Sequence, residues 1–539
     1  MNILVLEATS EYQSEIWNRV LKGLRVSECY AVFLDKDEEE HSILSKEFKI
    51  KRAFYHRQSF NCDYSYAEDI MEEAPPVDCD LLKQMSEYEK QIFWMMERGS
   101  SREYNHRWRD YIKHLRFWNY VLEKYKIDLV LSQITSHEIY DYIIGVLCRI
   151  KHIKFYSGIP LAYPQGRFSL FSDVYNQTPD VNEKMKQLLI KYKDYAEEDI
   201  PLKKNMEEMY SFYRWGKDIT PCYMKKGVNK CERPLYNFLY GNFSLARLLY
   251  AFYKKDKSSV CFRYVNIMIN RVKFLCNTIK SVFSLSCNTY KYYADRMYRK
   301  DVFREYQILL NYYKKTAVKA DYTKKYIYIP LPAQPEASTS PLGGEFVDVL
   351  LMIKMLSYYL PDGYELYIKE HPVYNGYAYL SEVSSYRTLD FYNEIQGLKN
   401  TKLISFDEDT YKLINNASAV ATITGTAGLE ALFKGKIVFM FGYMFYREAP
   451  NAIPIRNNED CIHAMDKMMH FKLEKNYFNQ LRIFFQIMEK YVFPGMIDQV
   501  GFRYLGVDTP QLREESIQNI AEAYLYRINE DMNDNKLVY

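Results

Sequence analysis

The stretch YIKEHP places a histidine and a proline directly after an alternating, strand-like run. Proline biases the preceding residue towards an extended backbone, so His371 is expected at the end of a strand, followed by Pro372. An imidazolium at that position could neutralise a departing phosphate or protonate it. Lys369 alternates with His371 and would lie on the same strand face. The competing interpretation is a histidine that only caps a loop.

The turn ITGTAGLE joins an apolar run to an amphipathic one. Gly425 and Gly428 would let the backbone turn tightly and approach a ligand closely. Thr424 and Thr426 offer hydroxyls beside the first amides of a helix. This arrangement favours an anion such as a nucleotide phosphate. Taken alone, however, the turn is more typical of an ordinary strand-to-helix connection.

A third loop, PAQPEAST, combines a carboxylate with two hydroxyls. Glu336, Ser338 and Thr339 could bind a ribose, a base edge or a sugar, and Glu336 is also a candidate catalytic residue. Gln334 in the same loop is a further candidate for substrate binding. For this loop alone, ordinary Pro and Ser turn chemistry is the favoured interpretation.

In the N-terminal half, the strand-like DLVLSQ runs into ITSHEIYDY. Either His137 or Glu138 could there be the general base that activates an acceptor hydroxyl. The alternative is helix capping by Ser136. Arg167, in YPQGRFS, is a candidate for binding a donor or acceptor carboxylate, because guanidinium pairs with carboxylate in a bidentate fork.

The acidic run FDEDT could suggest a metal site at Asp407, Glu408 and Asp409. It directly precedes a helical run, where acidic residues favour the helix amino end, so capping is the preferred interpretation. No His/Cys cluster with metal-ligand spacing occurs elsewhere. We therefore expect neither a required metal nor a cofactor beyond the donor substrate.

The elements that must position these residues follow an α/β pattern. Short apolar strands alternate with helices through residues 1–174 and again through residues 326–539, which is typical of βαβ units and parallel sheets. Two Rossmann-like domains facing a cleft, with helices at the C-terminal end, are therefore the expected architecture. Residues 175–325 lack this rhythm and are expected to form a basic helical insertion or linker.

Charge is balanced over the 539 residues, with a formal net charge of +3, so no global field favours nucleic acid. Residues 224–300 are the exception, with sixteen Lys or Arg against three acidic residues. This segment suits an anionic membrane surface, or alternatively a solvated helical hairpin. The absence of a long apolar run and of a signal-like start, together with scattered single cysteines, predicts a cytoplasmic protein; if the basic segment binds the membrane, it would be peripheral on the inner face.

In this order, the stretches PLPAQPEAST, YIKEHP and ITGTAGLEALFKGKIVFMFG resemble the capsule polysaccharide biosynthesis family, which includes Kdo transferases. The resemblance implies a GT-B glycosyltransferase with an N-terminal acceptor domain and a C-terminal nucleotide-sugar domain. It implies a CMP-activated donor carrying Kdo or a sialic-acid-like sugar, and a glycan or glycolipid acceptor.

The resemblance also assigns roles to single residues. His371 and Pro372 take the place of an HP pair, Thr424 and Thr426 supply the hydroxyls, and Glu430 would reach the ribose. Family members often carry a histidine in the PLPAQPE loop, where this chain has Pro332 and Ala333. Two alternatives stay open: a CDP-alditol phosphotransferase of the teichoic-acid type, and a non-catalytic scaffold of a capsule assembly complex.

Overall fold

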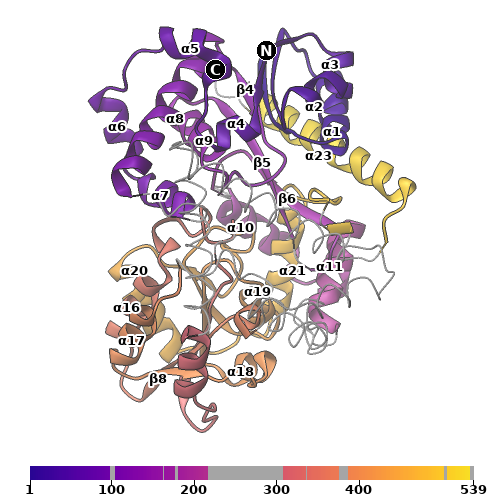
Figure 1. The fold of residues 1–539 in the computed structure, drawn as a ribbon. Coiled ribbons are helices and arrows are strands. Elements are labelled where there is room, and N and C mark those ends of the chain that lie inside the picture. The colour runs from indigo at the N-terminus through magenta and orange to yellow at the C-terminus, as the bar shows by residue number, and fades with distance from the viewer. Residues whose placement is uncertain are drawn as a thin grey trace, which may run out of the picture.

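The computed structural model describes residues 1–97, 103–161, 163–175, 180–216, 308–334, 337–375, 386–499, 501–502 and 507–534. The basic segment 224–300 and Glu336 lie outside these residues. Within the described chain, two sheets are flanked by helices, and Figure 1 shows the two halves one above the other. The predicted α/β class with two Rossmann-like, largely parallel sheets is confirmed.

The first sheet has seven strands in the order β13-β6-β5-β4-β1-β2-β3. Its strands are β1 (Asn2–Ala8), β2 (Glu28–Phe33), β3 (Ile50–Tyr55), β4 (Leu129–Leu131), β5 (Lys154–Pro160), β6 (Arg167–Phe171) and β13 (Val492–Pro494). The strands from β3 to β5 are parallel, whereas β6 runs antiparallel to both β5 and β13.

Helices cover both faces of this sheet. They are α1 (Glu11–Lys22), α2 (Lys36–His41), α3 (Ile43–Glu47), α4 (His56–Phe60), α5 (Glu68–Glu73), α6 (Cys79–Met85), α7 (Glu89–Glu97), α8 (Tyr104–Lys124) and α9 (Tyr140–Ile150). Side chains alternate along β1: Leu4 and Leu6 pack with Trp118 of α8, whereas Ile3 and Val5 share the core of α1. Both faces of the first sheet are therefore buried.

The second sheet is entirely parallel, in the order β12-β11-β10-β7-β8-β9. Its strands are β7 (Lys325–Pro330), β8 (Tyr364–Lys369), β9 (Thr401–Ile404), β10 (Ala419–Thr422), β11 (Ile437–Met440) and β12 (Ala452–Pro454). Its helical elements are η4 (Gly344–Val347), α16 (Val349–Tyr358), η5 (Pro372–Asn375), α17 (Leu389–Gly397), α18 (Thr410–Asn416), α19 (Thr426–Phe433), α20 (Asn458–Met469) and α21 (Tyr477–Met488). The periodicity predicted each of these strands up to β11.

The C-terminal part of the chain returns to the first half. Strand β13 pairs with β6, and α23 (Pro510–Asp534) packs along α1, as Figure 1 shows. The expected domain 326–539 therefore does not coincide with one sheet, because its last strand and helix complete the other. Helices α10 (Val181–Lys191) and α11 (Lys204–Trp215), from the expected insertion, pack against α21. No helix among the described residues has the length and apolarity needed to cross a bilayer.

A stack of four side chains lies between the two halves. The rings of Tyr175 and Tyr443 lie 4.2 Å apart at an interplanar angle of 15°. Arg149 lies 5.6 Å from the Tyr175 ring, and Arg456 lies 4.0 Å from the Tyr443 ring. Because Arg149 and Tyr175 belong to the first half and the other two residues to the second, cation–π and aromatic contacts join the halves directly.

Candidate functional site

Each sheet has one topological switch point, where successive crossovers change direction. In the second sheet, the chain runs from β7 outward to β8 and β9, and then returns to place β10 on the other side of β7. In the first sheet, β1 and β4 stand in the same relation. Ligands of open α/β sheets bind beyond the carboxyl ends of strands at such points. The loops after β7 and β10, and those after β1 and β4, are therefore the candidate ligand-binding loops.

The turn between β10 and α19 is tied to the loop that follows β7. The Thr424 hydroxyl donates a hydrogen bond to the backbone carbonyl of Ser338, and only 4% of Thr424 is exposed. The Gly425 amide donates to the Thr422 hydroxyl at 3.0 Å. Thr426 is the first residue of α19, and no side chain caps the amino end of this helix. The second switch point thus carries an uncapped helix amino end, which suits an anion.

The glycines of this turn serve protein packing. A Cβ on Gly428 would lie 2.9 Å from both the Thr422 methyl group and the Tyr446 hydroxyl, and one on Gly425 would lie 2.9 Å from the Thr422 hydroxyl. Neither glycine has a positive φ. The structure therefore gives both glycines a role in packing the turn against Thr422 and Tyr446. The Tyr446 hydroxyl also donates to the Gly425 carbonyl.

His371 follows β8, with Pro372 opening η5, as predicted. Its Nδ1 accepts a hydrogen bond from the Val373 amide at 3.2 Å, so the neutral imidazole carries its proton on Nε2. Burial, together with the positive charges of Arg387 and Lys369, lowers the pKa of His371 to about 4. His371 is therefore neutral at neutral pH, and not the imidazolium that the sequence suggested.

Lys369 is buried, with 5% exposed, and its ammonium donates to the Glu408 carbonyl and to the Thr410 hydroxyl. It joins the ends of β8 and β9 and acts on His371 through its charge. Glu430, on α19, lies near Tyr213 and Tyr446. Burial is the main cause that raises the pKa of both tyrosines, and the negative charge of Glu430 is the second.

A buried network clamps the loops after β7 and β8. The Arg387 Nε donates to Glu370 at 2.9 Å, and its Nη1 donates to Oε1 of Gln334. Nη2 of Arg387 reaches the Pro332 carbonyl at 3.1 Å, and Glu370 accepts from the His371 amide at 3.0 Å. Gln334 also donates from Nε2 to the Val347 carbonyl at 2.9 Å. Its side chain is thus engaged in holding the loop, which differs from the expected substrate contact.

The remaining residues of the PAQPEAST loop have different surroundings. Ser338 is partly exposed and offers its carbonyl to Thr424. Thr339 is fully buried, and its carbonyl accepts from the Gly343 amide at 2.8 Å, so its hydroxyl lies inside the protein. Of these two residues, Ser338 is therefore the one that reaches the surface.

At the first switch point, the structure brings His137 and Glu138 together. The His137 Nδ1 lies 2.7 Å from the Thr135 carbonyl, which can only accept, so Nδ1 carries a proton. The other ring nitrogen, Nε2, lies 3.4 Å from a Glu138 carboxylate oxygen. Both side chains are partly exposed, at 22% and 30%. This arrangement leaves Nε2 of His137 or the Glu138 carboxylate as the atoms able to take a proton.

Two neighbouring carboxylates, Glu7 and Asp141, were missed by the sequence reasoning. Burial raises the pKa of Glu7 to about 7. Burial also raises the pKa of Asp141, which accepts from the amides of His137 and Glu138. Ser136 does not cap α9, whose N-cap is Ile139 without a side-chain bond. The only signal for Glu7 was its place where the first apolar run stops.

Arg167 lies apart from both switch points. Its guanidinium forms an ion pair with Glu208 of α11 and donates to the Asn205 carbonyl at 3.0 Å. With 9% of the side chain exposed, it is committed to holding α11, which does not fit the expected role in binding a ligand carboxylate.

The FDEDT stretch is a helix start. Asp409 is the N-cap of α18 and accepts from the Lys412 amide at 2.7 Å, as preferred from the sequence. Over the described ranges, no group of three or more His, Cys, Asp and Glu side chains could hold a metal ion.

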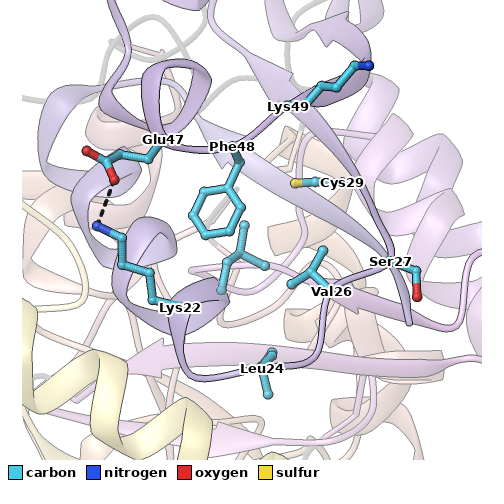
Figure 2. A pocket seen from close by; sticks show the side chains of 9 residues that line it. Lys22, Leu24, Val26, Ser27, Cys29, Glu47, Phe48 and Lys49 are labelled. Atoms are coloured by element: carbon cyan, nitrogen blue, oxygen red, sulfur yellow. Dashed lines mark ion pairs between the residues drawn. The ribbon is translucent and has the colours of Figure 1, made fainter.

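A hollow of about 450 Å³ lies at the amino ends of β2 and β3 in the first sheet (Figure 2). Its lining includes Leu24, Phe48 and Cys29, and a Lys22–Glu47 ion pair of 3.0 Å stands beside it. Cys29 lies near the amino end of β2, so this hollow is separate from the carboxyl-end loops described above.

Comparison with known proteins supports the resemblance seen in the motifs. Residues 268–449 match the family model described as capsule polysaccharide biosynthesis protein. The matched segment includes the loops after β7, β8 and β10. No curated protein matches the chain.

Several solved structures are similar at low identity. The Thermosulfurimonas dismutans KpsC, a beta Kdo 2,7 transferase, is 17% identical over 41% of this chain and 61% of its own, with a TM-score of 0.21. The UDP-GlcNAc 2-epimerase of Methanocaldococcus jannaschii is 11% identical over 91% of this chain and 99% of its own, with a TM-score of 0.23.

Proposed function

We propose, from the capsule polysaccharide biosynthesis match over residues 268–449, that the protein is a metal-independent GT-B glycosyltransferase of bacterial surface polysaccharide synthesis. It would transfer a sugar, Kdo or a sialic-acid-like sugar, from a CMP-activated donor to a glycan or glycolipid acceptor. The second half would bind the nucleotide sugar, and the first half the acceptor.

One observation supports this proposal above the others. The loops that carry the family-like motifs meet at one switch point: the Thr424 hydroxyl bonds to Ser338, and the Arg387 network fixes the loop of His371 to the loop after β7. An isolated Thr-Gly turn would mean little. A helix amino end, two hydroxyls and a histidine at adjacent strand ends together suit a phosphate.

In this scheme, the donor phosphate would lie at the amino end of α19, where backbone amides favour negative charge. His371, neutral with its proton on Nε2, would donate a hydrogen bond to a phosphate oxygen and so stabilise the negative charge that develops on the leaving CMP. Thr426 and Ser338 would add hydroxyl donors. Glu430 would contact the ribose, and Glu336 stays a candidate in the same loop.

On the acceptor side, Nε2 of His137 or the Glu138 carboxylate would take the proton of the attacking hydroxyl. The two groups lie 3.4 Å apart, so either could face the same acceptor hydroxyl. Closure of the two halves would then bring acceptor and donor together.

The test is nucleotide binding by the full chain, measured by thermal shift and calorimetry with CMP, UDP, CMP-Kdo and CDP-glycerol. We expect stabilisation by CMP and CMP-Kdo that is weakened in His371→Ala and retained in the control His470→Ala, whose side chain, directly after α20, is 75% exposed. Stabilisation by CDP-glycerol without CMP would favour the alditol phosphotransferase instead. Binding of no nucleotide would favour the scaffold.

A further inference from the structure

The loop after β4, residues 132–138, is held at its start by Glu7. This residue is the last but one of β1 (Asn2–Ala8), has a positive φ of 60° and is 8% exposed. One oxygen of its carboxylate accepts from the Gln133 amide at 2.7 Å and from the Ile134 amide at 3.3 Å. The Ser132 hydroxyl lies 3.1 Å from the other oxygen. Glu7 therefore spans the switch point between β1 and β4.

The end of the same loop is held by Asp141, in the first turn of α9. One Asp141 oxygen accepts from the amides of Glu138 and Tyr142, at 2.8 and 2.6 Å, and the other accepts from the amide of His137 at 3.1 Å. Asp141 is 2% exposed. Both of its oxygens are thus acceptors, a requirement that a carboxylate meets and an amide does not.

Between the two carboxylates the backbone is strained. Ile139 has φ 68° and ψ −71°, and the Tyr140 amide donates to the Glu138 carbonyl at 2.8 Å in a three-residue turn. A β-branched residue at positive φ is an outlier that persists only when its surroundings impose it. Here the bonds from Asp141 to both sides of Ile139 impose it, and the turn sets the direction of Glu138.

Unsatisfied polar groups lie in the same loop. Nε2 of Gln133 and the Ser136 hydroxyl are buried without a hydrogen-bond partner among the residues that the structure describes. Gln133 is 1% exposed and Ser136 is 2% exposed. Buried polar atoms left without partners are uncommon and call for water or a ligand group. The strained backbone at Ile139 and these two unpartnered polar atoms thus lie in the same loop as His137 and Glu138.

We propose that Glu7 and Asp141 are positioning residues for the proton acceptor of the first half. They hold the loop 132–138 from both ends, so that Nε2 of His137 and the Glu138 carboxylate stand where an acceptor hydroxyl is deprotonated. This proposal rests on the proposed glycosyltransferase function for its chemistry, whereas the organisation of the loop stands on the hydrogen bonds alone.

The test combines amide hydrogen exchange with donor turnover, using the full chain and CMP-Kdo. In Asp141→Asn the side-chain NH₂ must face a backbone N–H, and two donors cannot pair. Hydrogen exchange of the backbone amides of residues 137, 138 and 142 should therefore become about tenfold faster. Glu7→Ala should do the same at residues 133 and 134. Glu7→Gln should restore protection, because one amide oxygen can accept both N–H groups while its NH₂ donates to Ser132. Asp80→Asn, at an exposed position, is the control.

Turnover is read as CMP release from CMP-Kdo. We expect kcat to fall by on the order of tenfold or more in Asp141→Asn and Glu7→Ala, with KM for the donor and affinity for CMP unchanged, because the donor contacts lie on the other sheet. Unchanged exchange in Asp141→Asn, or increased exchange with an unchanged kcat, would overturn the proposal. If the wild type neither binds CMP nor releases it from CMP-Kdo, the glycosyltransferase function fails, while the exchange data still decide how the loop is held.

Discussion

The ion pair between Arg387 and Glu370 should be a sensitive point of the second half. Its side chains are 1% and 0% exposed, and Arg387 also donates to Gln334 and to the Pro332 carbonyl. Arg387→Met keeps much of the side-chain volume but removes the charge and every donor. Glu370 would then be a buried carboxylate without its counter-ion.

The expected magnitude follows from this burial. Removing one partner of a buried ion pair costs about 3–5 kcal/mol, because the remaining charge is uncompensated. Acceptors left without donors, here the Gln334 and Pro332 oxygens, add about 1–3 kcal/mol. We therefore expect a loss of at least about 4 kcal/mol in the free energy of unfolding. Adding Glu370→Gln should return about 1–3 kcal/mol of it, since no buried charge remains.

The assay is urea unfolding, monitored by tryptophan fluorescence and by far-UV circular dichroism. Four of the five tryptophans lie on helices α1, α7 and α8 of the first half, whereas Trp215 lies on α11, which packs against α21. Tryptophan fluorescence therefore reports mainly the first half, and far-UV circular dichroism reports both halves. The Arg387→Met loss should appear mainly in circular dichroism. Arg513→Met, which breaks the exposed pair with Asp508, should cost no more than about 1 kcal/mol. A loss below about 1 kcal/mol in Arg387→Met, or a double variant less stable than the single one, would refute the reasoning.

Three further predictions concern charge. Burial raises the pKa of Glu7 from 4.5 to about 7, so the folded state holds this proton more tightly than the unfolded state does. As pH rises from 4.5 to 7, the free energy of unfolding of the wild type should therefore fall by about 3 kcal/mol relative to Glu7→Gln, as measured by urea unfolding. A phosphate should raise the low pKa of His371, so CMP binding at mildly acid pH should take up a proton; calorimetry in buffers of different ionisation enthalpy would show uptake, and an equal uptake in His371→Gln would contradict this. Binding to anionic vesicles should weaken with salt and with Lys-to-Glu changes at Lys254, Lys255 and Lys257, in co-sedimentation; no binding at low salt would mean that these charges are only solvated.

Local pattern predicted much of the fold. The strands and helices around YIKEHP and ITGTAGLE were read from periods of two and 3.6 residues, and these periods reflect burial on one or both faces of each element. The Asp409 cap could also be predicted from the sequence, because the capping residue directly precedes its helix.

Long-range contacts were not accessible in this way. Arg387 reaches residues more than fifty positions away, and Asp141 acts on a strained turn that no composition signal marks. Arg167 looked available for a ligand because Glu208, its partner, lies on a helix placed only by tertiary packing. Strand β13 has three residues, too few to carry a period, so its return to the first sheet could not be predicted.

Helix α23 is synthesised late but covers elements of the first half that are synthesised early. The ring of Tyr524 packs 5.1 Å from that of Trp17 in α1, and the Tyr524 hydroxyl donates to the Ser132 carbonyl in the β4 loop. The residues between α1 and α23 take roughly 25 to 100 s to translate at typical rates. During that interval the nascent first half presents an uncovered apolar face and a β4 loop lacking one of its supports. Completion of the first half therefore waits until α23 has been made, and chaperone dependence should be strongest for a stalled chain that ends before Pro510.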